Sequence, residues 1–70
     1  MNSKEEIFNK AKKLHISGNI KEAKKLYLEL IKIDGDNFLF QNLLGTTLLQ
    51  LKKYDEAIKH LDISIKLNPS

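Results

Sequence analysis

Residues 19–37 read NIKEAKKLYLELIKIDGDN, and the pattern returns at 53–70 as KYDEAIKHLDISIKLNPS. The match is closest between residues 20–23 and 54–57, and both stretches end on turn-forming residues. The two stretches are separated by 34 residues, and the same separation aligns further apolar or small residues, including some upstream. The aligned pairs are Ala11 with Gly45, Leu14 with Leu48, Ile20 with Tyr54, Ala23 with Ala57, Tyr27 with Leu61, and Ile33 with Leu67. The chain is therefore two copies of one unit.

Four segments of this unit pair carry apolar residues at helical spacing. Ser3 and Glu6 have the spacing of a capping box, which predicts the start of a first helix, and Gly18 predicts its end. Asn19 is expected to cap a second helix that runs to Ile33. A third helix should follow the turn at 34–37, and a fourth should lie between the lysine pair at 52–53 and the proline at 69.

The apolar stripes of these helices predict the core. Its expected members are Ile7, Ala11, Leu14, Ile20, Ala23, Tyr27, Leu30, Ile33, Phe40, Leu44, Leu48, Leu51, Tyr54, Ala57, Leu61, Ile65 and Leu67. No segment alternates with period two, so strands are not expected. The predicted fold class is all-α.

A helix-turn-helix unit with a repeat length of about 34 residues resembles the tetratricopeptide repeat family. The resemblance implies a tandem helix-turn-helix α-solenoid of four antiparallel helices, in a single domain over residues 1–70, with repeat one at 3–36 and repeat two at 37–70. Small residues stand where paired helices should cross closely, namely Ala11, Ala23, Gly45 and Ala57. Four positions depart from the family pattern: Lys10, Leu30, Gln41 and Ser64.

Composition excludes several classes of protein. A chain of 70 residues holds one small core, and the absence of cysteine excludes disulfides and thiolate zinc sites. The net charge is +3, but all twelve basic residues are lysine, so the arginine fork that binds phosphates and base edges is missing and we expect no nucleic-acid partner. The N-terminus lacks the layout of a secretory signal, and the longest uncharged run, 37–51, is shorter than the roughly 20 residues that span a bilayer. We expect a cytoplasmic protein with no membrane partner.

Residues that could carry chemistry are few. His15 and His60 lie on different predicted helices and match no metal-ligand spacing, so they are interpreted as ordinary surface histidines. The run 34–36 resembles the start of a calcium loop, but Gly45 stands where the closing glutamate would be needed. We therefore expect no catalytic, cofactor-binding or metal-binding residues, and the chain is predicted not to be an enzyme.

The resemblance implies a function in binding proteins. In tetratricopeptide proteins the first helix of each repeat lines a concave groove that receives a peptide or a helix of a partner. The positions of this chain that match the groove are Phe8, Lys12, His15, Leu39, Asn42, Thr46 and Leu49. Phe8 and Leu49 would contact apolar side chains, and Lys12 would contact an acidic one. Alternatively, Leu39 or Leu49 completes the core.

Self-assembly is the competing interpretation. Tyr27 should pack against the third helix, whereas its counterpart Leu61 has no following helix to cover it. Aliphatic residues left exposed in one row usually mark an interface. The predicted self-association face consists of Ile58, Leu61 and Ile65, covered by a second copy in a homodimer or by further repeats of a longer array.

Overall fold

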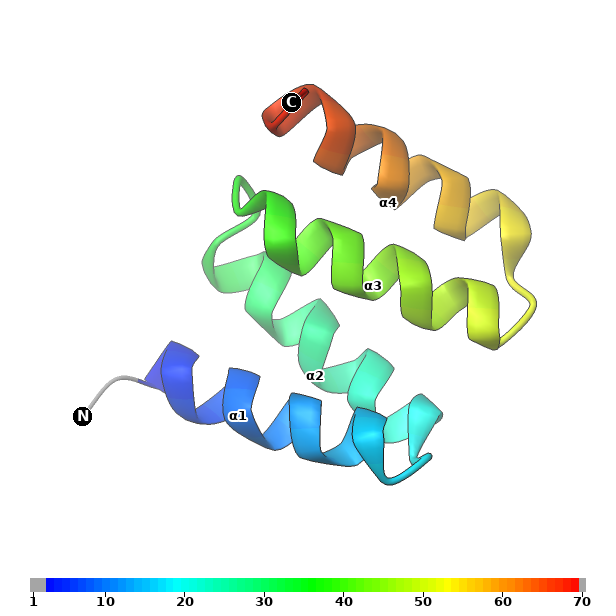
Figure 1. The fold of residues 1–70 in the computed structure, drawn as a ribbon. Coiled ribbons are helices and arrows are strands. Elements are labelled where there is room, and N and C mark those ends of the chain that lie inside the picture. Colours follow the sequence, from blue (N-terminus) through cyan, green and yellow to red (C-terminus); the bar gives the residue numbers. More distant parts are fainter. Residues whose placement is uncertain (1–2, 70) are drawn as a thin grey trace.

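Four α-helices follow one another along the chain in the computed structural model, which describes residues 3–69. They are α1 (Ser3–Ile16), α2 (Ile20–Ile33), α3 (Phe38–Gln50) and α4 (Tyr54–Leu67). Each helix packs antiparallel to the next, and within the described residues no helix backbone packs against a helix that is not its neighbour in sequence (Figure 1). Residues 3–69 contain no strand. The predicted all-α stack of two helical hairpins is confirmed.

The turns inside the two hairpins have the same backbone structure. After α1, Gly18 adopts a φ of 89° and Asn19 donates its backbone N–H to the Leu14 carbonyl, with N···O 2.8 Å. After α3, Lys52 adopts a φ of 64°, and the bond from the backbone N–H of Lys53 to the Leu48 carbonyl measures 2.9 Å. This is the Schellman arrangement, in which one residue with a left-handed backbone lets the chain turn back on the helix. The second copy builds it without glycine.

The caps of the two central helices differ from what the sequence predicts. Asn37 caps α3, because its Oδ1 accepts from the backbone N–H of Leu39 at 3.0 Å. The predicted cap at Asn19 is wrong, although α2 begins directly after it. Its amide instead donates to the Ser17 hydroxyl at 2.9 Å, a partner that the Schellman turn brings within reach.

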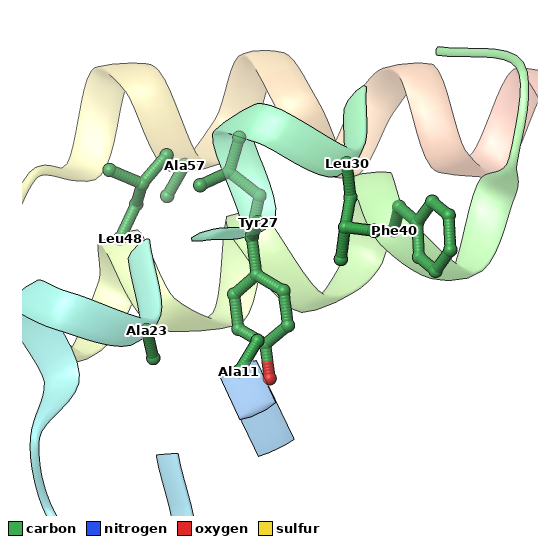
Figure 2. Packing of buried hydrophobic residues seen from close by; sticks show 8 residues of the cluster. Ala11, Ala23, Tyr27, Leu30, Phe40, Leu48 and Ala57 are labelled. Carbon is green, nitrogen blue, oxygen red and sulfur yellow. The ribbon is translucent and has the colours of Figure 1, made fainter. Parts of the chain in front are cut away.

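The core lies along the middle of the stack and is formed by α2 and α3 with one alanine each from α1 and α4. Its buried members are Ala11, Ala23, Tyr27, Leu30, Phe40, Leu44, Leu48 and Ala57 (Figure 2). Tyr27 is among the largest fully buried side chains, and its ring points from α2 toward Ala11 of α1 (Figure 2). The expected core is confirmed at these eight positions.

Other predicted core residues lie at the surface. Ile33 and Leu67 are exposed because they end α2 and α4. Burial in these helices stops one turn earlier, at Leu30 and Ser64. Tyr54 and Ile65 are exposed because α4 packs against α3 alone. The remaining predicted members are half-buried: Ile7, Leu14, Ile20, Leu51 and Leu61.

Two of the departures from the family pattern are explained by buried hydrogen bonds. Gln41 of α3 donates from Nε2 to the Gly35 carbonyl at 3.0 Å and accepts at Oε1 from His60 Nδ1 of α4 at 2.7 Å. Ser64 donates its hydroxyl to the Phe38 carbonyl at 2.9 Å. Both residues therefore connect α3 to its surroundings without leaving a buried polar group unsatisfied.

Gly45 sets the distance between α3 and α4. A Cβ on this residue would lie 2.6 Å from Cγ of Leu61 and 3.3 Å from the Ala57 carbonyl oxygen. The first distance is well inside ordinary van der Waals contact, and the second involves backbone that cannot rotate away. The predicted need for a small residue at this crossing is confirmed.

We expect Lys52→Gly to stabilise the protein, because a left-handed backbone costs a non-glycine residue about 1–2 kcal/mol. The more flexible unfolded chain offsets part of this gain, so a rise of a few degrees in melting temperature is expected. Lys53→Gly is the matched control, since Lys53 has a φ of −95° and should lose stability on the same change. A melting temperature that falls for both variants would contradict strain at Lys52.

We expect Gly45→Ala to lower the free energy of unfolding by about 1–2 kcal/mol in urea titrations, because overpacking against Leu61 outweighs the better helix propensity of alanine. In a Leu61→Ala background the clashing atoms are gone, so the same substitution should cost much less or become stabilising. An equal effect in the two backgrounds would show that Leu61 does not restrict this position.

Candidate functional site

The helices α1 and α3 lie on the same face of the stack, and their side chains contact each other at two places. At one end the rings of Phe8 and Phe40 make an edge-to-face contact, with centroids 5.2 Å apart. At the other end Nε2 of His15 lies 2.6 Å from Oε1 of Gln50. The backbones of α1 and α3 do not pack on each other, so these two side-chain bridges close the ends of the space between them.

A hollow of about 330 Å³ lies between these helices. It is lined by Lys12, His15, Ile16, Tyr27 and Leu43. Its walls come from α1 and α3, and Tyr27 of α2 lies beneath it. The hollow combines apolar walls with one cationic side chain.

A chain of hydrogen bonds fixes the polar side of the hollow. The Gln50 oxygen accepts from His15 Nε2, so the proton of a neutral imidazole lies on that nitrogen and Nδ1 accepts from the Tyr27 hydroxyl at 3.1 Å. Burial raises the pKa of Tyr27 above its ordinary value of 10.0, which keeps the hydroxyl protonated as a donor. One imidazole therefore connects α1, α2 and α3.

The predicted groove residues of α1 are of two kinds: half-buried side chains that contact α2 or α3, and one exposed side chain. Phe8 and His15 are half-buried and are held by their partners on α3 and α2. Lys12 is exposed, and its Nζ lies 4.5 Å from the centre of the Phe8 ring, a distance at which a cation is attracted to the ring face. Of this row, Lys12 is thus the side chain that a ligand could meet directly.

The predicted groove residues of α3 all lie at the surface. Leu39 and Leu49 are each 42% exposed, so neither completes the core. Asn42 and Thr46 are also exposed, and the Thr46 hydroxyl donates to the Asn42 carbonyl at 3.0 Å within the helix. These four residues share one side of α3, next to the hollow wall formed by Leu43.

Sequence reasoning missed Ile16 and Leu43. Ile16 is 88% exposed at the rim of the hollow, and Leu43 forms the opposite wall. Ile16 follows Lys12 by four residues and Phe8 by eight, so helical spacing along this row could have identified it. We name the surface formed by Lys12, Ile16, Leu39, Leu43 and Leu49 the α1/α3 face.

The predicted self-association residues lie on a different surface. Ile58 and Ile65 of α4 are 55% and 61% exposed, whereas Leu61 is half-buried because it packs over Gly45. Of the three predicted residues, the two isoleucines are therefore the exposed ones, with Leu61 between them.

Linear stacking of helix-turn-helix units, each in contact only with its neighbours, defines an α-helical repeat protein. Two family models, both described as tetratricopeptide repeat, match the chain at residues 7–37 and 26–59. The chain belongs to the tetratricopeptide repeat family, whose repeats generally mediate protein–protein interaction and are typically not enzymes. No curated protein and no solved structure gives a significant match.

Among residues 3–69, no group of three histidine, cysteine, aspartate or glutamate side chains is arranged to hold a metal ion. No helix in the same range has the length and apolar character needed to cross a membrane.

Besides Tyr27, two titratable side chains have shifted pKa values, and both serve structure. Hydrogen bonds from Lys4, at 3.1 Å, and from Asn37 lower the pKa of Asp34 and connect the start of α1 to the turn before α3. Burial lowers the pKa of His60 below 6.5, and the charge of Lys59 lowers it further against an opposing effect of Glu56. His60 is thus not the ordinary surface histidine expected from the sequence.

We expect stability to fall as the pH drops below about 6.5, because the folded protein holds a proton on His60 less strongly than the unfolded chain does. The contribution is fully present above the unfolded pKa and is lost as the pH falls through the folded value. His60→Gln removes the titration, so its melting temperature should decline less than that of the wild type between about pH 7.5 and pH 5.5. Equal declines would show that other groups dominate in this window.

Proposed function

We propose that the chain is a scaffold module that binds a peptide or a helix of a partner protein through the α1/α3 face. The observation that carries the proposal is Ile16, a large aliphatic side chain that is 88% exposed beside a hollow with apolar walls. An exposed apolar group next to a concave apolar surface is the arrangement that receives an anchor side chain in helix and peptide recognition.

The chemistry of the face favours a particular kind of ligand. An aliphatic or aromatic side chain would enter the hollow between Ile16 and Leu43, and Leu49 would extend the apolar contact along α3. Lys12 would pair with an acidic residue of the ligand, and its position over the Phe8 ring holds it at the rim. The backbone of the ligand could hydrogen-bond to the exposed amide of Asn42.

The size of the face limits the affinity. Two helical hairpins present a small surface, and interfaces below the standard size are typically weak and transient. A dissociation constant on the order of micromolar is therefore expected.

Selection of displayed random peptides on the immobilised chain tests the proposal. Selected peptides should combine aliphatic or aromatic residues with acidic ones, and in fluorescence anisotropy Lys12→Glu or Ile16→Lys should weaken their binding about tenfold or more. Leu28→Lys is the matched control, because Leu28 is a 39% exposed aliphatic residue of α2 outside this face. Peptides that bind all three variants as well as the wild type would place the binding surface elsewhere.

A further inference from the structure

The outer side of α4 carries a row of apolar side chains that no part of residues 3–69 covers. Tyr54, Ile58 and Ile65 are 56%, 55% and 61% exposed, and the half-buried Leu61 lies between them. Their spacing of four, three and four residues puts all four on one side of the helix. We name this set the α4 row.

The first repeat shows what the equivalent row does when it has a neighbour. The equivalent residues of that repeat lie on α2 and are Ile20, Lys24, Tyr27 and Ile31. With α3 as neighbour, Ile20, Lys24 and Ile31 are half-buried, whereas Tyr27 is buried with its ring pointing toward Ala11 of α1 (Figure 2). The second repeat replaces the lysine of that row with Ile58, so the uncovered copy is the more apolar of the two.

The free side of α1 is a poor cover for the α4 row. On α3, Gln41 and Gly45 face α4, so the buried row Phe40, Leu44 and Thr47 is the one turned to α2. The residues of α1 at the equivalent positions of the first repeat are Glu6, Lys10 and Lys13, and all are exposed. Stacking a second copy head to tail would bury three charged side chains against apolar ones, which is costly without partners.

The charged residues beside the α4 row are ordered so that they complement the same residues of a second copy. Asp55, Lys59, Asp62 and Lys66 lie along one flank of the row and are exposed. In residues 3–69 none of these four takes part in an ion pair. In an antiparallel pair of α4 helices related by a two-fold axis, each flank faces its own copy. With the axis near Leu61, Asp55 comes opposite Lys66 of the second copy, and Lys59 comes opposite Asp62.

A parallel arrangement lacks this match. In a parallel pair, the charged flank of one α4 helix faces the uncharged flank of the other α4 helix. That uncharged flank carries Ala57 and Ser64, which are buried against α3. The four charges would then gain no partners.

We propose that the α4 row is covered by α4 of a second copy of this chain, packed antiparallel across a two-fold axis near Leu61. Tyr54, Ile58 and Ile65 are removed from water in the dimer, and two symmetric sets of Asp–Lys pairs border them. Leu61 meets its own copy at the axis. The α1/α3 face is built from helices outside this contact, so each copy keeps it.

Sedimentation equilibrium of the full chain tests whether a second copy covers the α4 row. The wild type should show twice the chain mass of 8.1 kDa at high micromolar concentration, and Ile58→Lys or Ile65→Lys should raise the dimer dissociation constant at least tenfold. Both residues are exposed in the single chain, so far-ultraviolet circular dichroism should show unchanged helix content. Leu28→Lys is the matched control and should leave the dimer intact. A monomeric wild type, or a species that grows beyond a dimer with concentration, would overturn the proposal.

A charge exchange tests the orientation. Asp55→Lys combined with Asp62→Lys makes the whole flank basic, and Lys59→Glu combined with Lys66→Glu makes it acidic. Each double variant alone should dimerise at least tenfold more weakly than the wild type, because like charges meet across the axis. An equimolar mixture should form a heterodimer at least as tight as the wild-type dimer. Two variants that dimerise as well alone as when mixed would show that the helices do not pair antiparallel at this register.

Discussion

The ring of Tyr27 is the contact on which the rest of the fold depends. It is fully buried, it extends from α2 toward α1, and its hydroxyl donates to His15, whose other nitrogen reaches Gln50 of α3. The phenol thus provides apolar area in the core and a polar end at the edge of the hollow. Because the same side chain forms the bottom of the hollow, the packing of the first three helices and the shape of the candidate binding surface cannot change independently.

The fold was predictable because its information is local and occurs twice. Helix boundaries follow from apolar spacing and turn residues, and each boundary in one repeat supports the matching boundary in the other. Gly18 indicates its turn directly, since glycine favours a positive φ. Lys52 does not, and only its alignment with Gly18 reveals that the backbone there is left-handed.

Details of the candidate site were less predictable, because they depend on contacts between segments distant in the sequence. Gln41 and Ser64 look like poor core residues until their partners, the Gly35 and Phe38 carbonyls, are placed beside them. His60 looks like a surface residue because nothing in its own helix indicates burial. Ile16 differs from these residues, because its position in the helical period of the groove row is visible in the sequence. Its exposure is not, since that depends on where α3 lies.

A stack in which every helix touches only its sequence neighbours has a consequence for how it opens. The α2 and α3 helices are held from two sides, whereas α1 and α4 are each held from one. Contacts between neighbouring segments close only short loops, so a hairpin can form or dissolve without disturbing the far end of the chain. In a single copy, backbone amides of α1 and α4 should therefore exchange with solvent through local fraying, while those of α2 and α3 require the whole unit to unfold.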